Sequence, residues 1–243
     1  MYLTIDHGNS RTKTGVFTPD GNLIKTQPLP DQFLSTIKGF IEQNNISHII
    51  ISTTGSREWQ LQDLNFNGQL IELNHETPLP IEIIYKTPET LGRDRIASAC
   101  GAHHIYNDKN CLIVDAGTCI TTDLITSKGN FLGGNISPGI RMRLTAMHEK
   151  TARLPLVEPD FPENPFGDST QHALQNGACL GAVMEIEGIL SRSKDAYGDV
   201  SVVITGGDAD LLATRLECQI FVEPELVIQG LFQILSFNVK NYL

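Results

Sequence analysis

Two stretches of the chain resemble each other, and this duplication restricts the possible fold more than any other feature. The clearer copy covers residues 112–134, and the weaker copy covers residues 3–24. Each copy predicts an apolar strand, an Asp-x-Gly turn, a polar strand, a Gly-Asn turn and a third strand. The two copies share six identical residues in the same order when one position of the first copy is skipped after Thr12. These pairs are Asp6 and Asp115, Gly8 and Gly117, Thr12 and Thr121, Thr18 and Thr126, Gly21 and Gly129, and Asn22 and Asn130.

The turn after the first strand of each copy has the composition of a phosphate-binding loop. Asp6 and Asp115 end apolar strands, and the glycine two residues later permits a tight turn and close approach of a ligand. Asn9 and Thr118 then offer a polar side chain together with a backbone N–H. Such loops suit phosphate oxygens, and the carboxylate suits a cation or a cation-bound water. An Asp that caps its own turn is the alternative for one copy, but two copies favour phosphate binding.

The composition favours a globular chain of two domains. Hydrophobic residues make up 40% of the 243 residues, which is enough for substantial cores. Acidic residues outnumber basic ones by 28 to 18, which gives a formal net charge of −10. We expect no nucleic-acid partner, because such proteins usually carry a basic patch. An anionic small molecule is not excluded, since a few placed Arg and Lys side chains can bind one.

Several other classes of protein are disfavoured. The chain has no run of eighteen apolar residues and no basic-then-apolar leader, so we expect neither a membrane span nor a signal peptide. The five cysteines are odd in number and include no Cys-x-x-Cys, which favours reduced thiols in a cytoplasmic protein. The seven histidines show no metal-site spacing, because the adjacent His103 and His104 point to different faces of a helix.

The first half predicts the order strand, strand, strand, helix, strand. Apolar periodicity and turn signals place the strands at 1–5, 13–18, 23–27 and 48–52, and the helix runs from a cap at Asp31 to about Asn44. A short helix and loop at 55–67 contains the only tryptophan, Trp59. Short strands at 70–73 and 81–85 follow.

In the second half, strands are predicted at 111–115, 201–205 and 219–222, and helices at 140–150, 170–192, 209–216 and 226–241. The segment 133–139, with its double glycine, is expected to lead into a helix, and it suits either close backbone approach to a ligand or an ordinary loop. Gly177 and Gly181 lie four residues apart in the long helix and favour close helix–helix contact. Gly206 and Gly207 stand at a strand-to-helix junction, a typical but unspecific setting for nucleotide binding.

A charged cluster stands where the helix after residue 92 begins. Gly92, Arg93, Asp94 and Arg95 end a polar connection that starts at Tyr85. The N-terminal amides of a helix carry partial positive charge and favour anions. Asp94 is also placed to cap the helix, and that alternative stays open. Two arginines beside the Asp exceed what a cap needs, so we favour a functional cluster.

Two halves with Asp-x-Gly hairpins imply a nucleotide cleft between two domains, and the motifs resemble those of the acetate and sugar kinase/Hsp70/actin superfamily. Within it, the chain most closely resembles the type III pantothenate kinase family over nearly its whole length. The motifs that carry the resemblance are Asp6 to Ser10 with Lys13, Tyr85 with Gly92 to Arg95, Asp115 to Thr118 with Asp123, Gly133-Gly134 through Pro138-Gly139, and Thr170 ahead of Gly177.

The resemblance implies an α/β fold with two duplicated ribonuclease H-like (actin-like ATPase) domains and a nucleotide cleft between them. Residues 1–110 would form the N-terminal domain, with the first phosphate loop and the pantothenate motif. Residues 111–243 would form the C-terminal domain, with the second phosphate loop and the adenosine motif. The last helix of this second domain could pack back on the first.

The resemblance also implies ATP-dependent phosphorylation of pantothenate to 4'-phosphopantothenate, the first step of coenzyme A biosynthesis. Family members are cytosolic homodimers that need Mg²⁺ and a monovalent cation, K⁺ or NH₄⁺. ATP would be bound by Asp6, His7, Gly8, Asn9, Ser10, Arg11, Thr12, Lys13 and Thr118. Pantothenate would be bound by Tyr85, Gly92, Arg93, Asp94, Arg95 and Thr170. Asp94 would act as general base, Asp115 would hold the monovalent cation, and Asp6 would hold Mg²⁺ through water.

The chemistry of the residues is consistent with these roles. A primary hydroxyl attacks the γ-phosphate in line, and Asp94 can accept its proton while Arg95 holds a carboxylate or a phosphate oxygen. A nearby Arg would keep Asp94 ionised. His7 stands where the family usually has an apolar or small residue, and Cys119 stands where Ala is usual. These two departures concern the packing of the phosphate loops.

Two other functions are compatible with the same fold. Some relatives of the family are accessory factors in gene regulation, so a non-catalytic binder is one alternative, although Asp6, Lys13, Asp94, Arg95 and Asp115 together speak against it. The other alternative is a kinase for a different small hydroxyl acceptor, such as a sugar. A panel of acceptors tested with ATP would separate the three.

Overall fold

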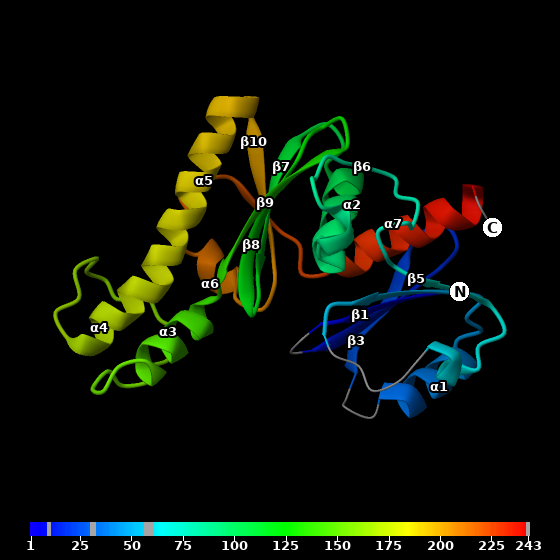
Figure 1. The fold of residues 1–243 in the computed structure, drawn as a ribbon, viewed down its shortest axis with the longest axis horizontal. Helices are drawn as coiled ribbons and strands as arrows, with labels where there is room; N and C mark the ends of the chain where they lie inside the picture. The colour runs from blue at the N-terminus through cyan, green and yellow to red at the C-terminus, as the bar shows by residue number, and fades with distance from the viewer. Residues whose placement is uncertain (9–10, 30–32, 56–60, 242–243) are drawn as a thin grey trace. The chain divides into compact units, whose positions relative to one another are not determined.

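The computed structural model describes residues 1–8, 11–29, 33–55 and 61–241, and the chain divides into two compact units, each with its own sheet (Figure 1). Unit 1 is assembled from three stretches of the chain, and unit 2 from two. Unit 1 comprises Met1–Asn107, Gly129–Phe131 and Glu225–Leu243, and unit 2 comprises Asp108–Lys128 and Leu132–Pro224. The predicted cap Asp31, as well as Trp59, lies outside the described residues.

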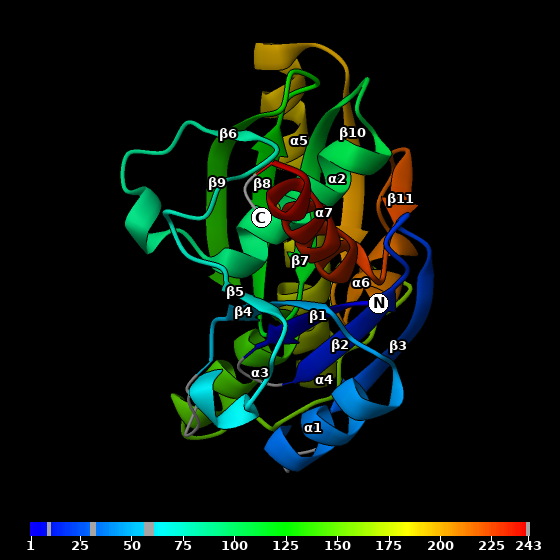
Figure 2. The ribbon, with the colours of Figure 1, turned by 90° about the vertical axis from the view of Figure 1, so that its right-hand side faces the viewer.

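The sheet of unit 1 has the strand order β3-β2-β1-β4-β5. Its strands are β1 (Tyr2–His7), β2 (Thr12–Phe17), β3 (Leu23–Leu29), β4 (His48–Thr53) and β5 (Gln69–Glu72). The first three strands form an antiparallel meander, and β4 and β5 add in parallel on the other side of β1. The predicted meander and the buried parallel strand β4 are therefore confirmed, and Figure 2 shows both. Apolar runs in β1 and β4 fit this central, two-sided burial.

The described part of unit 1 contains five helical segments, of which α1, α2 and α7 contact the sheet. The five segments are α1 (Phe33–Gln43), η1 (Leu61–Leu64), η2 (Pro88–Thr90), α2 (Arg93–Ile105) and α7 (Leu226–Asn241). Ile37 and Phe40 of α1 pack into a core with Leu3 and Ile51 of the sheet. Helices α2 and α7 lie side by side (Figure 2), and the ring of Phe232 in α7 stacks on Phe17 of β2 with centroids 4.5 Å apart.

The sheet of unit 2 has the strand order β11-β10-β7-β8-β9. Its strands are β7 (Asn110–Ala116), β8 (Cys119–Ile125), β9 (Asn130–Pro138), β10 (Val200–Thr205) and β11 (Ile220–Val222). Strands β7 and β8 form the predicted antiparallel hairpin, and β10 runs parallel to β7. A short strand, β6 (Glu82–Ile83), pairs in parallel with the first residues of β9, Asn130 and Phe131.

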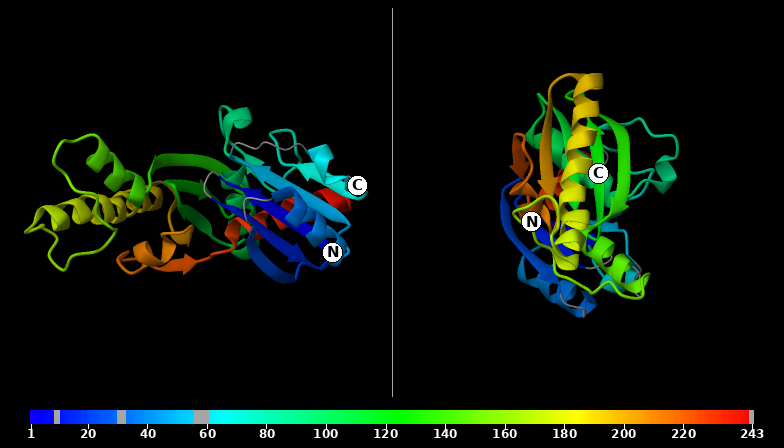
Figure 3. Two further views of the ribbon diagram at one scale, coloured as in Figure 1. Left: turned by 90° about the horizontal axis from the view of Figure 1, so that it is seen from below. Right: turned by 90° about the vertical axis from the view of Figure 1, so that its left-hand side faces the viewer.

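One face of this second sheet is covered by the longest helix of unit 2, α5 (Gly181–Tyr197), as Figure 3 shows. Ile186 and Leu190 of α5 pack into one core with Leu112 and Val202 of the sheet. The other helices of unit 2 are α3 (Ile140–Glu149), α4 (Thr170–Gln175), the π-helical turn η3 (Asn176–Leu180) and α6 (Ala209–Ala213).

Two predicted elements of unit 2 are wrong in detail. The predicted continuous helix at 170–192 is interrupted by the π-helical turn η3, and its last part extends to Tyr197. The predicted loop at 133–139 is instead mostly strand, because β9 continues to Pro138. Gly134 is required inside this strand since a Cβ atom there would collide with the backbone of Thr122 and lie 2.5 Å from Oδ1 of Asp123. Close packing between β8 and β9 therefore explains Gly134, and a positive φ of 94° explains the glycine at 133.

The duplicated hairpins are present, but the structure corrects their alignment. Asp6 pairs with Lys13, seven residues later, whereas Asp115 pairs with Thr121, six residues later. The additional residue of the first copy thus lies within the turn and not after Thr12. Turns tolerate insertions better than paired strands do, since an insertion in a strand would change its register. Lys13 is therefore the counterpart of Thr121, and the expected match of Thr12 with Thr121 is wrong.

The cysteines are all free thiols, as expected from their number and spacing. Cys100, Cys111 and Cys179 are buried, and burial raises the pKa of the Cys111 thiol to about 11. Among the residues that the structure describes, no helix is both long and apolar enough to traverse a bilayer.

Candidate active site

The first phosphate loop connects β1 to β2 in unit 1. Asp6 and His7, at the end of β1, are partly buried, and the N–H of Gly8 donates to the carbonyl of Arg11 at 2.9 Å, which closes the turn. Nδ1 of His7 lies 2.7 Å from Oγ1 of Thr12. The unusual histidine is thus held against the loop by a polar contact. Asn9 and Ser10, which we expected to bind ATP, lie outside the described residues.

Lys13, the expected phosphate ligand at the start of β2, is fixed by a contact that the sequence does not predict. Its Nζ atom lies 2.7 Å from Oε2 of Glu225, the residue that precedes α7. Oε1 of Glu225 accepts a hydrogen bond of 3.2 Å from Thr26 on β3. This contact therefore joins the N-terminal stretch of unit 1, at Lys13, to its C-terminal stretch, at Glu225.

In the charged cluster that opens α2, Asp94 makes one capping contact and keeps a second carboxylate oxygen. Oδ1 of Asp94 accepts a hydrogen bond of 2.9 Å from the N–H of Arg95, so the carboxylate does satisfy one of the first amides of the helix. Within the described part of the chain, the carboxylate has no other hydrogen-bond partner. The second oxygen of Asp94 is consequently available to accept a proton. The residue is partly exposed, as a group that meets a substrate must be.

The aromatic and cationic members of the same cluster lie together as expected. Arg95 is 6% exposed, and its guanidinium carbon lies 5.9 Å from the centroid of the Tyr85 ring. The Tyr85 ring also lies 6.4 Å from that of Phe131. A planar guanidinium over an aromatic face is favourable and fixes both side chains. Tyr85 and Arg95 therefore form one wall beside the start of α2, where Gly92 and Arg93 are partly exposed.

The second phosphate loop is the Asp115–Thr118 turn between β7 and β8. The N–H of Gly117 donates to the carbonyl of Cys119 at 2.9 Å, which makes the turn tight. Asp115 is partly buried at the end of β7, and Thr118 is exposed at the tip. This arrangement places the exposed Thr118 at the tip of the turn, where the Asp-x-Gly pattern predicts it.

Two further segments converge on this turn. The N–H of Gly139, which precedes α3, donates to the carbonyl of Thr118 at 3.1 Å. The N–H of Asp208, which precedes α6, donates to the carbonyl of Ala116 at 2.9 Å. Gly206 has a positive φ of 97°, and a Cβ atom there would lie 2.6 Å from Oδ1 of Asp115. The Gly206-Gly207 junction is thus in direct contact with the second phosphate loop.

The residues around Asp115 fit a monovalent cation. Metal sites with three or more His, Cys, Asp or Glu side chains are absent from the described residues. A monovalent ion, however, can be held by one carboxylate together with carbonyl oxygens. The partly buried Asp115 carboxylate lies in the same turn as the carbonyl groups of Ala116 and Thr118. On the first loop, the partly exposed carboxylate of Asp6 is an oxygen ligand of the kind that Mg²⁺ prefers.

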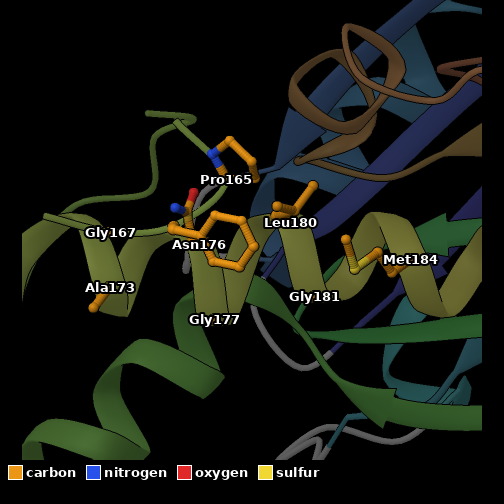
Figure 4. Close-up of a pocket in the computed structure, with 9 residues that line it drawn as sticks. Pro165, Gly167, Ala173, Asn176, Gly177, Leu180, Gly181 and Met184 are labelled. Atoms are coloured by element: carbon orange, nitrogen blue, oxygen red, sulfur yellow. The ribbon is translucent and has the colours of Figure 1, made fainter. Parts of the chain in front are cut away.

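Thr170, the last expected pantothenate ligand, is exposed as the first residue of α4. The helix start is capped by Ser169, whose side chain accepts a hydrogen bond of 3.2 Å from the N–H of His172. Beyond α4, the π-helical turn forms one side of an open hollow of about 480 Å³ (Figure 4). Its lining residues are Pro165, Phe166, Gly167, Ala173, Asn176, Gly177, Leu180, Gly181 and Met184.

This hollow corrects the interpretation of Gly177. We expected a contact with another helix, but a Cβ atom at Gly177 would meet nothing within 4 Å among the described residues. The flanking apolar side chains are also open to solvent, with Phe166 82% and Met184 59% exposed. Within the described part of the chain, Gly177 therefore borders a surface, whereas a Cβ atom at Gly181 would lie 4.0 Å from the Arg143 side chain of α3.

The region between α3 and α5 is held by charged hydrogen bonds close to the hollow. Nε of Arg143 donates to the carbonyl of Pro138 at 2.8 Å, and another guanidinium nitrogen donates to Glu185 on α5. Burial alone would raise the pKa of Glu185, but hydrogen bonds from Ser137 and Arg143 outweigh it and hold this pKa below its ordinary value. Glu185 therefore stays ionised and fixes the end of β9 to α5.

Comparisons with known proteins agree with this architecture. A sequence model of a family described as Type III pantothenate kinase matches residues 2–192. A Type III pantothenate kinase of Flavobacterium johnsoniae is 37% identical over 244 residues, which cover 99% of this chain and 100% of the relative.

Solved structures show the same fold. A protein of Campylobacter jejuni, described as a candidate Baf family transcriptional activator, superposes with a TM-score of 0.66 and 25% identity, covering 98% of this chain and 99% of its own. A candidate N-acetylmannosamine kinase of Listeria monocytogenes superposes with a TM-score of 0.57 and 16% identity, covering 99% of both chains. These similarities confirm the predicted actin-like α/β fold with two sheets.

Proposed function

Because the chain belongs to the type III pantothenate kinase family, we propose that it transfers the γ-phosphate of ATP to pantothenate. The product is 4'-phosphopantothenate, in the first step of coenzyme A biosynthesis. The structural observation that carries the proposal is the convergence of Gly139 and Gly206 on the Asp115–Thr118 turn. A turn with that support is held in one conformation, which is what a phosphate-binding loop requires.

ATP is proposed to be held by both phosphate loops. Asp6, Gly8 and Lys13 would serve the phosphates from unit 1, together with the neighbouring residues of the same loop, and Thr118 would serve them from unit 2. The contact of the Gly206-Gly207 junction with the second loop supports a role for that junction in binding the adenosine part.

Pantothenate is proposed to bind at the start of α2. Its primary hydroxyl attacks the γ-phosphorus, its proton passes to the second oxygen of Asp94, and ADP leaves with the electrons of the broken bond. The contact of the buried Arg95 guanidinium with the partly buried Tyr85 ring supports a fixed wall for the substrate. Arg93, which is partly exposed, has room to meet the carboxylate of pantothenate.

Two cations are proposed to assist this reaction. Asp115 and neighbouring carbonyl oxygens would hold K⁺ or NH₄⁺, and Asp6 would hold Mg²⁺ through water. A monovalent ion beside Asp115 offsets the repulsion between this carboxylate and the phosphates of ATP. The partial burial of Asp115 at the end of β7 supports this assignment, because water screens a charge less there than on the open surface.

A homodimer in the cytoplasm is the proposed working form. The hollow beside η3, with exposed Phe166 and Met184, supports an interface there, because monomers rarely leave such apolar groups together in solvent. Thr170 lies close to this region in sequence, which supports the participation of the dimer in forming the substrate site. Five free cysteines support a reducing compartment.

The proposal is tested by offering ATP with a panel of acceptors that contains pantothenate, small sugars and carboxylates. We expect ADP release only with pantothenate. A sugar that is used equally well would replace the proposed substrate. The similarity to the candidate transcriptional activator of Campylobacter jejuni favours regulation as the second candidate function. Absence of transfer to every acceptor, with ATP still bound, would support that alternative.

A further inference from the structure

The contact between Lys13 and Glu225 joins two residues that are distant in sequence. Nζ of Lys13 lies 2.7 Å from Oε2 of Glu225, and the side chains are 35% and 24% exposed. A pair with this exposure is only partly screened by water, and each of its members has lost some hydration. The carboxylate also accepts a hydrogen bond from Thr26 at 3.2 Å. Glu225 is thus fixed by two different partners from the sheet.

The first turn of α7 and its packing on β2 determine the position of Glu225. The N–H of Gln229 donates to the carbonyl of Glu225 at 2.9 Å, so the residue stands at the start of α7. Ile228, one turn further, is buried and packs where Gly15 of β2 has no side chain. Larger residues at position 15 would meet Ile228, so the glycine lets the first turn of α7 lie directly on β2. The carboxylate is therefore carried by a rigid element.

The register of the sheet explains why this carboxylate meets Lys13. Gly15 pairs with Thr26 across the β2–β3 ladder, so the two residues share one face of the sheet. Lys13 lies two residues before Gly15 in β2 and therefore points to the same face. Glu225, Thr26 and Lys13 consequently meet on the face where α7 begins. Asp6, the cross-strand partner of Lys13, also belongs to this face.

We propose that Glu225 is a positioning residue that orders the Lys13 ammonium for contact with the phosphates of ATP. This inference rests on the proposed function, because it takes Lys13 as a phosphate ligand. An ammonium group carries three N–H donors, so a bond to one carboxylate oxygen is compatible with a bond to phosphate. A lysine side chain that Glu225 already holds before ATP binds loses less rotamer freedom on binding.

The size of the effect follows from this rotamer freedom. Fixing a fully mobile lysine side chain corresponds to a factor of about 30 in an equilibrium constant. The ion pair has removed part of that freedom, so we expect Glu225→Ala to lower kcat/KM for ATP and the affinity for ATP about tenfold. Glu225→Gln, which retains the shape and one acceptor oxygen, should lie between the wild type and Glu225→Ala. It also serves as the second variant if Glu225→Ala fails to fold.

A double-mutant cycle tests the inference. ATP affinity is measured by calorimetry, and turnover is measured with pantothenate, for the wild type, Glu225→Ala, Lys13→Ala and the double variant. If Glu225 acts through Lys13, its replacement has little further effect in the Lys13→Ala background. Glu158→Ala is the matched control, because Glu158 forms an ion pair of the same length, 2.7 Å, with Arg141 on the exposed surface of unit 2. It should leave both quantities unchanged.

Three outcomes would overturn the inference. One is an equal loss on replacing Glu225 in both backgrounds, which would assign it only a structural role at the start of α7. The others are an unchanged or increased ATP affinity in Glu225→Ala, and a wild type that does not bind ATP. A wild type that binds ATP without phosphorylating pantothenate would refute the proposed function alone. The calorimetric cycle would then still decide the role of Glu225.

Discussion

Replacement of Gly206 by alanine tests why the junction of β10 and α6 requires a glycine. Two reasons are possible, the backbone conformation and the lack of room for a side chain. The residue has a φ of 97°, a conformation that L side chains rarely adopt. A Cβ atom there would also lie 2.5 Å from the carbonyl oxygen of Ala116 and 2.6 Å from Oδ1 of Asp115. The substitution therefore combines backbone strain with a collision against the second phosphate loop.

The two costs can be estimated and measured separately. A positive φ costs a residue with a Cβ atom about 1–2 kcal/mol, and overpacking against fixed atoms costs about 1–3 kcal/mol more. Gly198, at the end of α5, is a suitable control, because its φ is 78° but a Cβ atom there meets nothing within 4 Å. Gly198→Ala should lose about 1–2 kcal/mol of stability, from backbone strain alone. Gly206→Ala should lose about 3 kcal/mol of stability, from strain and overpacking together.

The assay combines stability with turnover. In a chain of this length, about 1 kcal/mol corresponds to a shift of about 2–4 °C in Tm, so the two variants should differ by several degrees in thermal unfolding. Since a shift of the loop by about 1 Å can cost about 100-fold in rate, Gly206→Ala should lose about that factor in kcat/KM for ATP. Gly198→Ala should keep its activity. Equal stability losses in the two variants, or full ATP use by Gly206→Ala, would refute the reasoning.

Three further predictions concern the proposed reaction. Asp94→Asn should lower kcat about 10²–10⁴-fold and leave pantothenate binding by calorimetry largely intact, since the residue would serve as a base; a kcat near that of the wild type would reduce Asp94 to a cap. ATP turnover should be faster in KCl than in NaCl at equal ionic strength, and Asp115→Ala should lose that difference; equal wild-type rates in both salts would contradict a cation site. Phe166→Asp should weaken the dimer more than tenfold in sedimentation experiments at micromolar concentration, because it places a charge in an apolar contact; a monomeric wild type would exclude the interface.

Local patterns in the sequence predict most of the fold. The apolar run 48–52 predicts the buried parallel strand β4, and the amphipathic run 226–241 predicts α7 with the observed bounds. The second hairpin is predicted because its strands and its Asp-Ala-Gly-Thr turn are adjacent in the chain. In all three, residues near one another in sequence determine the conformation, so the pattern is sufficient.

The remaining features depend on contacts between distant residues. Gly134 was expected in a loop, because no local pattern shows that the backbone of Thr122 approaches it. The residue added to the first hairpin was expected after Thr12, because chain order does not reveal which residues face each other across a ladder. Glu225 carries no motif, and its partner Thr26 lies 199 residues away.

The composition of unit 1 from separate stretches has a consequence for biosynthesis. Helix α7 is synthesised after every other helix and strand described here, yet its Leu231, Ile234 and Leu235 are buried, with Phe232 stacked on Phe17 of the second strand. The N-terminal strands must therefore wait for almost the entire polypeptide before their sheet is fully covered. Closing so long a loop adds only about 0.6 kcal/mol for each doubling of its length, so the delay is one of time more than of stability. Unit 2 lies within a nearly continuous stretch and can fold first, which reverses the usual N-to-C order of cotranslational folding.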